Sequence, residues 1–514
     1  MYRRKILGQQ KLDIPFGVEL DAMNRWVKLA SIMPWDKIED LYAANANFKG
    51  PYGQVSKSGR LAFAALYIQN RLVITDEETV FQIQENPSMQ YFCGFEGYSP
   101  EAPFDSSLMV HFRKRITAEM MKEISEEAFA EEAKKAALDA AKKNSDDDDD
   151  SGGGNCNDGD GGIDGDVDAV ESKPKGTLFI DATCCPSDIH YPTDMYLLNH
   201  ARELTEVIID RLHEQLVIQS KIFEQLTKHG VIKPRTYREV ARRAYMSFTK
   251  KRKHSEGELR FAIRQQLQYV RRNLDSIAKQ VELGASLQCL DRVLYKKLLV
   301  ISELYRQQKQ MYDDKTKRIE DRIVSIAQPH LRPIVRGKEH KPVEFGAKIA
   351  TALVGGFSFT IQLEYDNFYE AKYLETSAEE YNRIFGFYPE VIIGDKAYWT
   401  NDNRKYCKSK GIRLSCPKKG PKTEEFKEAE RELLYKDGCE RNAIEGNYGV
   451  GKRKYGLALI MTKLYDTTLT AISFGFFVGN MERLLRLLSL PSFEIWQFLV
   501  FVRWCCRVRL ALIC

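Results

Sequence analysis

Two apolar runs far apart in this chain each lead into an aspartate. Thr177–Ile180 precedes Asp181, and Val391–Gly394 precedes Asp395. Short runs rich in β-branched and aromatic residues are typical of buried strands. A carboxylate at the end of such a strand is held at the rim of a sheet by rigid backbone. The two runs therefore predict an α/β fold whose sheet presents acidic side chains at its rim.

A third acidic residue, Glu445, lies in a segment with helical spacing. Successive residues of an α-helix are rotated by about 100° around its axis. Arg441, Glu445, Tyr448 and Lys452 therefore fall within one narrow stripe of a single helix. The pattern predicts a helix that adds one carboxylate to the two aspartates.

Three carboxylates from separate segments suit a site that holds divalent cations for phosphodiester chemistry. Two Mg²⁺ (or Mn²⁺) ions about 3.5–4 Å apart activate a nucleophile and neutralise charge on the phosphate. Each carboxylate also has a simpler interpretation: an aspartate after a strand is often a cap or turn residue, and Glu445 has an ion-pair partner in Arg441. Taken together, the pattern favours Asp181, Asp395 and Glu445 as catalytic residues and metal ligands.

The formal net charge is only +5, but it is unevenly distributed. Residues 144–170 contain ten Asp and no Lys or Arg, so the rest of the chain carries +15. That excess favours a polyanionic partner. The acidic segment has too little apolar content to offset the entropy of ordering, which predicts a disordered linker over residues 144–175. Its Asp and Gly pattern resembles a calcium loop, but Ala169 stands where the bidentate Glu is needed.

Residues 1–143 are predicted to form a helical N-terminal domain. Apolar residues within 60–73 follow a helical repeat, and Thr75 precedes Glu78 in a capping-box pattern. Short helices that end near Arg113 and Arg115 suit a helix-turn-helix-like module in which these arginines contact DNA. A helical bundle without that role is the alternative.

A long helical section follows the first aspartate and is predicted as an insertion over about residues 190–335. Within it, Lys233–Arg272 contains 13 Lys or Arg and 3 Glu, a net charge of +10, interleaved with aromatic residues. Such a stretch suits contact with DNA phosphates, and a solvated helical face is the alternative. The candidate DNA-binding residues here are Arg242, Arg243, Lys250, Lys251, Arg252 and Lys253.

Strand patterns return after the insertion. Lys348–Val354 and Phe357–Leu363 flank Gly355–Gly356, which predicts a hairpin with a glycine turn. A helix over about 376–384, the strand that ends at Asp395 and a short strand at 412–415 follow. The sequence thus predicts a core with a mixed sheet over residues 176–490.

The remaining features limit the class of protein. Eleven Cys without a CxxC pair favour reduced thiols over a disulfide framework or a zinc ribbon. No long apolar stretch follows Met1–Lys5, so no signal peptide is expected. Charged residues interrupt the apolar tail over residues 491–514, so we expect no membrane-spanning helix and assign the tail no role.

Five segments together resemble the DDE transposases of bacterial insertion sequences, in the group of insertion sequences four and five. They are Phe179–Thr183, Tyr191–Asp194, Glu344–Lys348, Gly394–Tyr398, and Arg441–Glu445 with Lys452–Gly456. Residues 14–115 resemble the helical domain that precedes the catalytic core in these transposases. The resemblance covers nearly the whole chain apart from the acidic linker and the tail.

The resemblance implies an RNase H-like core in which the three carboxylates hold divalent cations. It also implies that Arg441 and Lys452 contact DNA phosphates near the cleaved bond. Lys396 is a further DNA-binding candidate beside Asp395. The family usually has a Tyr three residues before the Arg, and this chain has Gly438 at that position.

Trp399, four residues after Asp395, is a candidate for stacking on an unpaired base. Packing of its ring against the core is the interpretation that we favour.

The predicted function is binding of the ends of a mobile element, followed by metal-dependent strand cleavage and strand transfer. The predicted partner is double-stranded DNA, namely the terminal inverted repeats of the element and the target DNA. We expect a homodimer in the DNA complex. The expected location is the cytoplasm, in association with the nucleoid. Two alternatives stay open. One is an RNase H-like nuclease that cleaves without joining strands, and the other is a DNA-binding regulator or inactive relic without catalysis.

Overall fold

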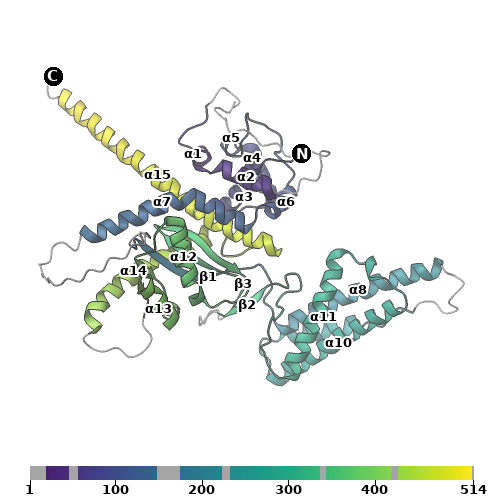
Figure 1. Cartoon of the computed structure of the whole chain (residues 1–514). Helices are drawn as coiled ribbons and strands as arrows, with labels where there is room; N and C mark the ends of the chain where they lie inside the picture. Colours follow the sequence, from purple (N-terminus) through teal and green to yellow (C-terminus); the bar gives the residue numbers. More distant parts are fainter. Residues whose placement is uncertain are drawn as a thin grey trace, which may run out of the picture. The chain divides into compact units, whose positions relative to one another are not determined.

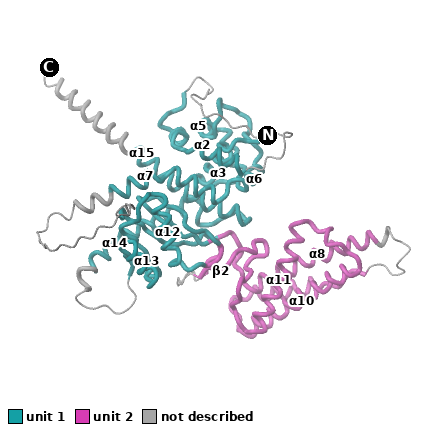
Figure 2. The backbone as a smooth tube through the Cα atoms, viewed as in Figure 1, with its two compact units in different colours: residues 1–186, 348–364, 368–514 teal, residues 187–347, 365–367 magenta. Residues whose placement is uncertain are grey.

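The computed structural model describes residues 19–45, 56–146, 174–222, 232–335, 343–417 and 426–511. The chain divides into two compact units, which Figure 1 and Figure 2 show. The first comprises residues 1–186, 348–364 and 368–514, and the second residues 187–347 and 365–367. Residues 147–173 of the predicted linker lie outside the described residues.

The N-terminal part of the first unit is helical. Its helices are α1 (Arg25–Ile32), α2 (Trp35–Asn45), α3 (Gly59–Leu72), α4 (Asp76–Glu85), α5 (Pro87–Phe92), α6 (Leu108–Arg115) and α7 (Ala118–Asp146). The hydroxyls of Ser58 and Thr75 cap α3 and α4, since they accept hydrogen bonds from the backbone amides of Leu61 and Glu78, both at 3.2 Å. The predicted helix within residues 60–73 and the predicted helix start at Thr75 are confirmed.

The N-terminal helices and the sheet share one hydrophobic core. Phe63 of α3 packs against Phe474 and Phe477 of α15 (Tyr465–Ala511), with ring centroids 5.0 and 5.4 Å apart. Phe129 of α7 stacks on Phe357 of β4 (Phe357–Glu364) at 5.6 Å. Segments that the sequence divides between two domains are therefore packed against one another within the first unit.

The sheet is mixed. Its strands are β1 (Thr177–Pro186), β2 (Arg332–Val335), β3 (Val343–Val354), β4, β5 (Val391–Ile393) and β6 (Arg413–Ser415), in the order β2-β3-β1-β5-β6 with β4 also paired to β3. β1 pairs with β5 and β5 with β6 in parallel, whereas β2 and β4 each pair with β3 in antiparallel fashion. The predicted mixed sheet is confirmed. β2 was not predicted, because this four-residue edge strand contains Pro333.

The predicted glycine turn joins β3 to β4. Gly355 and Gly356 have φ angles of +57° and +84°, which favour glycine. A Cβ at Gly355 would also lie 2.7 Å from the carbonyl oxygen of Ala133 on α7. The turn therefore depends on glycine both for its backbone angles and for its close approach to a helix.

Helices and short 3₁₀ turns follow the hairpin: η3 (Glu370–Lys372), α12 (Tyr373–Phe385), η4 (Lys396–Tyr398), α13 (Asn401–Ser409) and α14 (Phe426–Lys454). The last helix, α15, continues through Pro491 to Ala511, so most of the predicted tail extends this helix. No helix among the described residues has the length and apolar character needed to cross a membrane.

The second unit consists mainly of helices, in the place where the sequence predicts an insertion. They are α8 (Asp194–Ile222), α9 (Arg238–Lys250), α10 (Glu256–Glu282), η2 (Leu287–Cys289) and α11 (Arg292–Asp313). α8, α10 and α11 lie side by side (Figure 1) and bury two apolar clusters between them. The unit thus has its own core.

Candidate active site

Asp181 and Asp395 lie on neighbouring parallel strands at the same level. The register pairs Phe179 with Ile393, and each aspartate follows its paired residue by two positions. Asp181 is not at the end of its strand as predicted, because β1 continues to Pro186. The pairing between β1 and β5 ends earlier, at Phe179 and Ile393. The register therefore brings the two carboxylates together.

Backbone amides hold both carboxylates in place. Asp181 accepts a hydrogen bond from its neighbour Ala182 at 2.8 Å. Asp395 accepts one from Ala397 at 2.7 Å and so caps η4. Gly394 permits this turn to pack closely, since a Cβ there would lie 2.9 Å from the Tyr398 ring. Both acidic side chains are thus positioned by local backbone.

Helix α14 is attached to β1 through Tyr448. Its buried hydroxyl donates a hydrogen bond to the carbonyl oxygen of Asp181 at 2.9 Å and lies 2.6 Å from the Thr351 hydroxyl. One turn further along, Lys452 donates to the hydroxyl of Thr183 at 3.0 Å. The part of the predicted stripe from Tyr448 to Lys452 therefore contacts β1.

Glu445 lies on the same helix, one turn before Tyr448. It forms an ion pair with Arg441, in which the nearest guanidinium nitrogen and carboxylate oxygen are 2.8 Å apart. The Glu445 side chain is 52% exposed. Glu445 is thus in the ion-pair arrangement named above as the simpler interpretation.

The environment of Asp181 disfavours its charged form. Burial is the main cause that raises the pKa of Asp181 from 3.8 to about 6. The charges of Glu370 and Asp395 raise this pKa further, whereas the amide of Ala182 and the charge of Arg441 lower it. A nearby cation would favour the carboxylate.

The chemistry of the two aspartates fits a hard divalent cation. Carboxylate oxygens suit Mg²⁺ and Mn²⁺, and like charges side by side favour an added cation. In the part of the chain that the structure describes, no group of three or more His, Cys, Asp or Glu is arranged to hold a metal ion. Asp181 and Asp395 could supply the first two ligands of a metal site in their observed positions. Glu445 would first have to break its ion pair with Arg441.

Two other predicted site residues follow Asp395. Lys396 is exposed. Trp399 is partly buried, packs against the core, and has the Arg404 guanidinium 5.0 Å from its ring centroid. One face of the Trp399 ring is therefore occupied by Arg404, in keeping with the core-packing interpretation.

Two protein families match this chain. Residues 16–115 match a transposase domain (DUF772), and residues 392–482 match a transposase DDE domain. The second match includes Asp395 and Glu445. The resemblance to bacterial insertion-sequence DDE transposases is confirmed.

The chain is also similar to an uncharacterized protein, ORF8 in the nfe locus of Rhizobium meliloti. The two are 34% identical over 113 residues, which are 21% of this chain. The aligned part spans about half, 53%, of that relative's length. No solved structure matches this chain.

In the residues that match the first of these families, the two predicted DNA-binding arginines make internal contacts. Arg113 forms an ion pair with Asp76 of α4. Arg115 donates hydrogen bonds to the hydroxyls of Tyr42 at 2.9 Å and Ser56 at 3.2 Å. The contacts observed here stabilise the helical domain, and a role of either arginine in DNA binding stays a prediction.

The basic stretch of the second unit is exposed. Its six candidate residues are Arg242, Arg243, Lys250, Lys251, Arg252 and Lys253, all with exposed side chains on α9 or in its connection to α10. The connection is locally ordered, because Phe248 stacks on His254 at 3.7 Å and Ser255 forms a capping box with Glu258. Lys251 also pairs with Glu258 at 2.5 Å. We call these six residues the basic patch.

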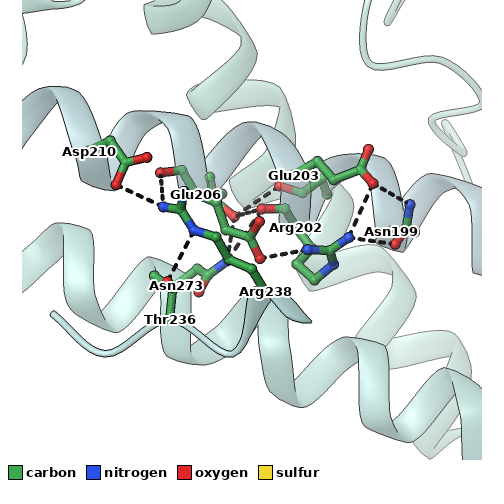
Figure 3. A network of polar contacts seen from close by, with 10 residues as sticks. Asn199, Arg202, Glu203, Glu206, Asp210, Thr236, Arg238 and Asn273 are labelled. Carbon is green, nitrogen blue, oxygen red and sulfur yellow. Dashed lines mark hydrogen bonds and ion pairs between the residues drawn. The ribbon is translucent and has the colours of Figure 1, made fainter. Parts of the chain in front are cut away.

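A network of polar side chains fixes the start of α9 (Figure 3). Arg238 donates to the carboxylate of Asp210 at 2.7 Å and to the carbonyl oxygen of Glu206 at 3.2 Å, both on α8. Arg202, which is 2% exposed, pairs with Glu206 at 2.6 Å. Asn273 of α10 donates to the carbonyl oxygen of Arg202 at 3.3 Å. The network links three helices and so orients the helix that begins the basic patch.

The sequence did not indicate Glu370, which influences Asp181 through its charge. Glu370 lies in the connection after β4, where no motif or periodicity marks it. Only the return of the chain after the hairpin brings it within electrostatic range of Asp181.

Proposed function

We propose that this transposase binds the ends of a mobile element and catalyses metal-dependent strand cleavage and strand transfer on double-stranded DNA. The observation that carries the proposal is the parallel register that sets Asp181 beside Asp395. The match of residues 392–482 to a transposase DDE domain supports it. We further propose that the mixed sheet is an RNase H-like core, because parallel and antiparallel strands join in the order that such a core needs.

In this proposal, Asp181 and Asp395 would hold Mg²⁺ or Mn²⁺, and Glu445 would be the third ligand in place of its ion pair with Arg441. Two such cations, when bound, activate the attacking oxygen and neutralise charge on the phosphate. The strands keep the aspartates fixed, so little reorganisation is needed during the reaction. Arg441, once released, offers a bidentate contact to a DNA phosphate, and Lys452 offers a point charge.

The reaction has two stages in this proposal. Hydrolysis frees a 3′-OH at each end of the element, and that hydroxyl then attacks a phosphodiester bond of the target. The basic patch contacts DNA phosphates independently of sequence, because exposed cations release counterions from the duplex when they bind. A homodimer in the DNA complex stays a prediction.

The test is a plasmid that carries both ends of the element, incubated with the full chain and Mg²⁺. Cleaved ends and joined products are measured separately. We expect both products from the unmodified protein and neither from Asp395→Asn. Asp402→Asn, which changes an exposed carboxylate on the nearby helix α13, is the matched control and should retain both.

The same assay separates the alternatives. Cleavage without joined products would support a nuclease of the same core. DNA binding without either product from the unmodified protein would support a regulator or an inactive relic.

A further inference from the structure

The motif Glu344–Lys348 has no role in the function proposed above, yet its lysine is unusually buried. Lys348 of β3 is only 8% exposed, and lysine is rarely buried unless it is paired. Its ammonium group lies 2.8 Å from a carboxylate oxygen of Glu370 and donates to the carbonyl oxygen of Phe368 at 2.9 Å. It also lies 4.9 Å from the centroid of the Phe368 ring. Lys348 therefore fixes the segment Phe368–Glu370 to the sheet.

The same segment is attached on its other side to the turn after Asp395. The Tyr369 hydroxyl donates to the carbonyl oxygen of Ala397 at 3.1 Å. Asn403, which is buried, donates to the carbonyl oxygens of Ala371 and Tyr398, both at 3.0 Å. η3 and η4 thus pack together. Glu370 is held between β3 and the turn that Asp395 caps.

The contact between Tyr369 and Ala397 places the charge of Glu370 close to the turn that Asp395 caps. The Glu370 side chain is 22% exposed, so the surrounding solvent screens it only in part.

We propose that Lys348 and Glu370 are positioning residues of the candidate active site: Lys348 holds the Glu370 carboxylate close to the turn that Asp395 caps, where it adds a further negative charge toward the divalent cations. The inference rests on the proposed function, to which these cations belong. Lys348 has a second effect, since its charge offsets that of Glu370 while cations are absent. Groups that hold or neighbour a metal ligand commonly tune metal affinity in this way.

The test is a calorimetric titration of the full chain with Mn²⁺ in the absence of DNA. We expect Glu370→Gln to weaken Mn²⁺ binding by about tenfold or more. The matched control is Glu380→Gln, because Glu380 of α12 is also paired to a lysine, Lys122, at 3.0 Å. The control should leave the Mn²⁺ affinity unchanged. Melting in EDTA shows whether each variant is folded.

Two substitutions test the lysine. Lys348→Arg keeps the charge and should retain more of the Mn²⁺ affinity than Lys348→Met, which leaves Glu370 without this cation. Equal affinities for the two variants would overturn the role of Lys348. If Lys348→Met does not fold, Glu370→Asp replaces it as the second measurement, and this shortened carboxylate should bind Mn²⁺ more tightly than Glu370→Gln.

Asp181→Asn, measured in parallel, separates this inference from the proposed function. If Asp181→Asn loses Mn²⁺ binding and Glu370→Gln keeps it, the positioning role of Glu370 is wrong and the site stands. If neither substitution changes Mn²⁺ binding, both the positioning role and the assignment of the metal site are wrong.

Discussion

The acidic site of the first unit and the basic patch of the second place their charges in opposite ways. Asp181 is held by strand register and a backbone amide, in surroundings that raise its pKa. The cations of the basic patch are exposed on a helix and its connection. Partly buried charges interact strongly and depend on geometry, whereas exposed charges are screened by salt and tolerate displacement. The first arrangement suits chemistry at one bond, and the second suits contact with a uniform polyanion.

The two regions should therefore respond differently to mutation. Residues that act as one unit lose function together, so a second substitution adds little to the first. Exposed cations contribute separately, so their losses should accumulate. The following predictions test this comparison in order of expected effect.

Removal of a single carboxylate charge at the acidic site should have the largest effect. Asp181→Asn, Asp395→Asn and Glu445→Gln should each lower strand cleavage by at least about a thousandfold, since metal-assisted charge neutralisation contributes several kcal/mol. The double variant Asp181→Asn, Asp395→Asn should be no worse than the singles. Cleavage rates in Mg²⁺, with DNA binding as the control, measure this. Near-normal cleavage by one variant would remove that residue from the site.

The pH dependence of stability should follow from the raised pKa of Asp181. A carboxyl whose folded pKa exceeds its unfolded value stabilises the protein below the unfolded pKa and loses that contribution as pH rises through the folded pKa. In EDTA, the free energy of unfolding of the unmodified protein should fall, relative to that of Asp181→Asn, by at most about 3 kcal/mol between about pH 4 and pH 7. Denaturant unfolding at several pH values measures the difference. Parallel curves for the two proteins would contradict the buried environment of Asp181.

The basic patch should show a graded loss. Replacing Lys250, Lys251, Arg252 and Lys253 with Ala should weaken binding to all DNA sequences and reduce the salt dependence by up to about 0.9 per lost contact on a log–log plot. Fluorescence anisotropy at several salt concentrations measures the slope. The control replaces four exposed lysines elsewhere in the second unit, namely Lys296, Lys309, Lys315 and Lys317. The same slope in both variants would mean that the patch faces solvent when DNA is bound.

The attachment of α14 to β1 should give the smallest effect. Tyr448→Phe removes the hydroxyl that contacts Asp181 and Thr351, and should lower the free energy of unfolding by about 1 kcal/mol. Tyr435→Phe on the same helix, where Tyr435 is 74% exposed, is the control and should have no measurable effect. A decrease of similar size in both variants would show that the buried hydroxyl is not what matters.

Local patterns sufficed for much of the fold. The capping residue Thr75, the glycine turn at Gly355–Gly356 and the helical stripe from Arg441 to Lys452 each depend on neighbours in the chain, so the sequence predicted them. The strand β2 was missed because Pro333 and its short length weaken the pattern. The position of Asp181 within β1 was also missed. The sequence predicted that the strand ends at Asp181, but β1 continues to Pro186 although its pairing with β5 ends at Phe179.

The sequence alone determined which residue types are available for the chemistry, and in which segments they occur, because strand alternation, helical spacing and charge are properties of the chain itself. The tertiary structure decided which of them meet. Strand register set Asp181 beside Asp395, and the return after the hairpin paired Glu370 with Lys348. Contacts between residues so far apart depend on pairing and packing of the whole unit, which no local pattern encodes.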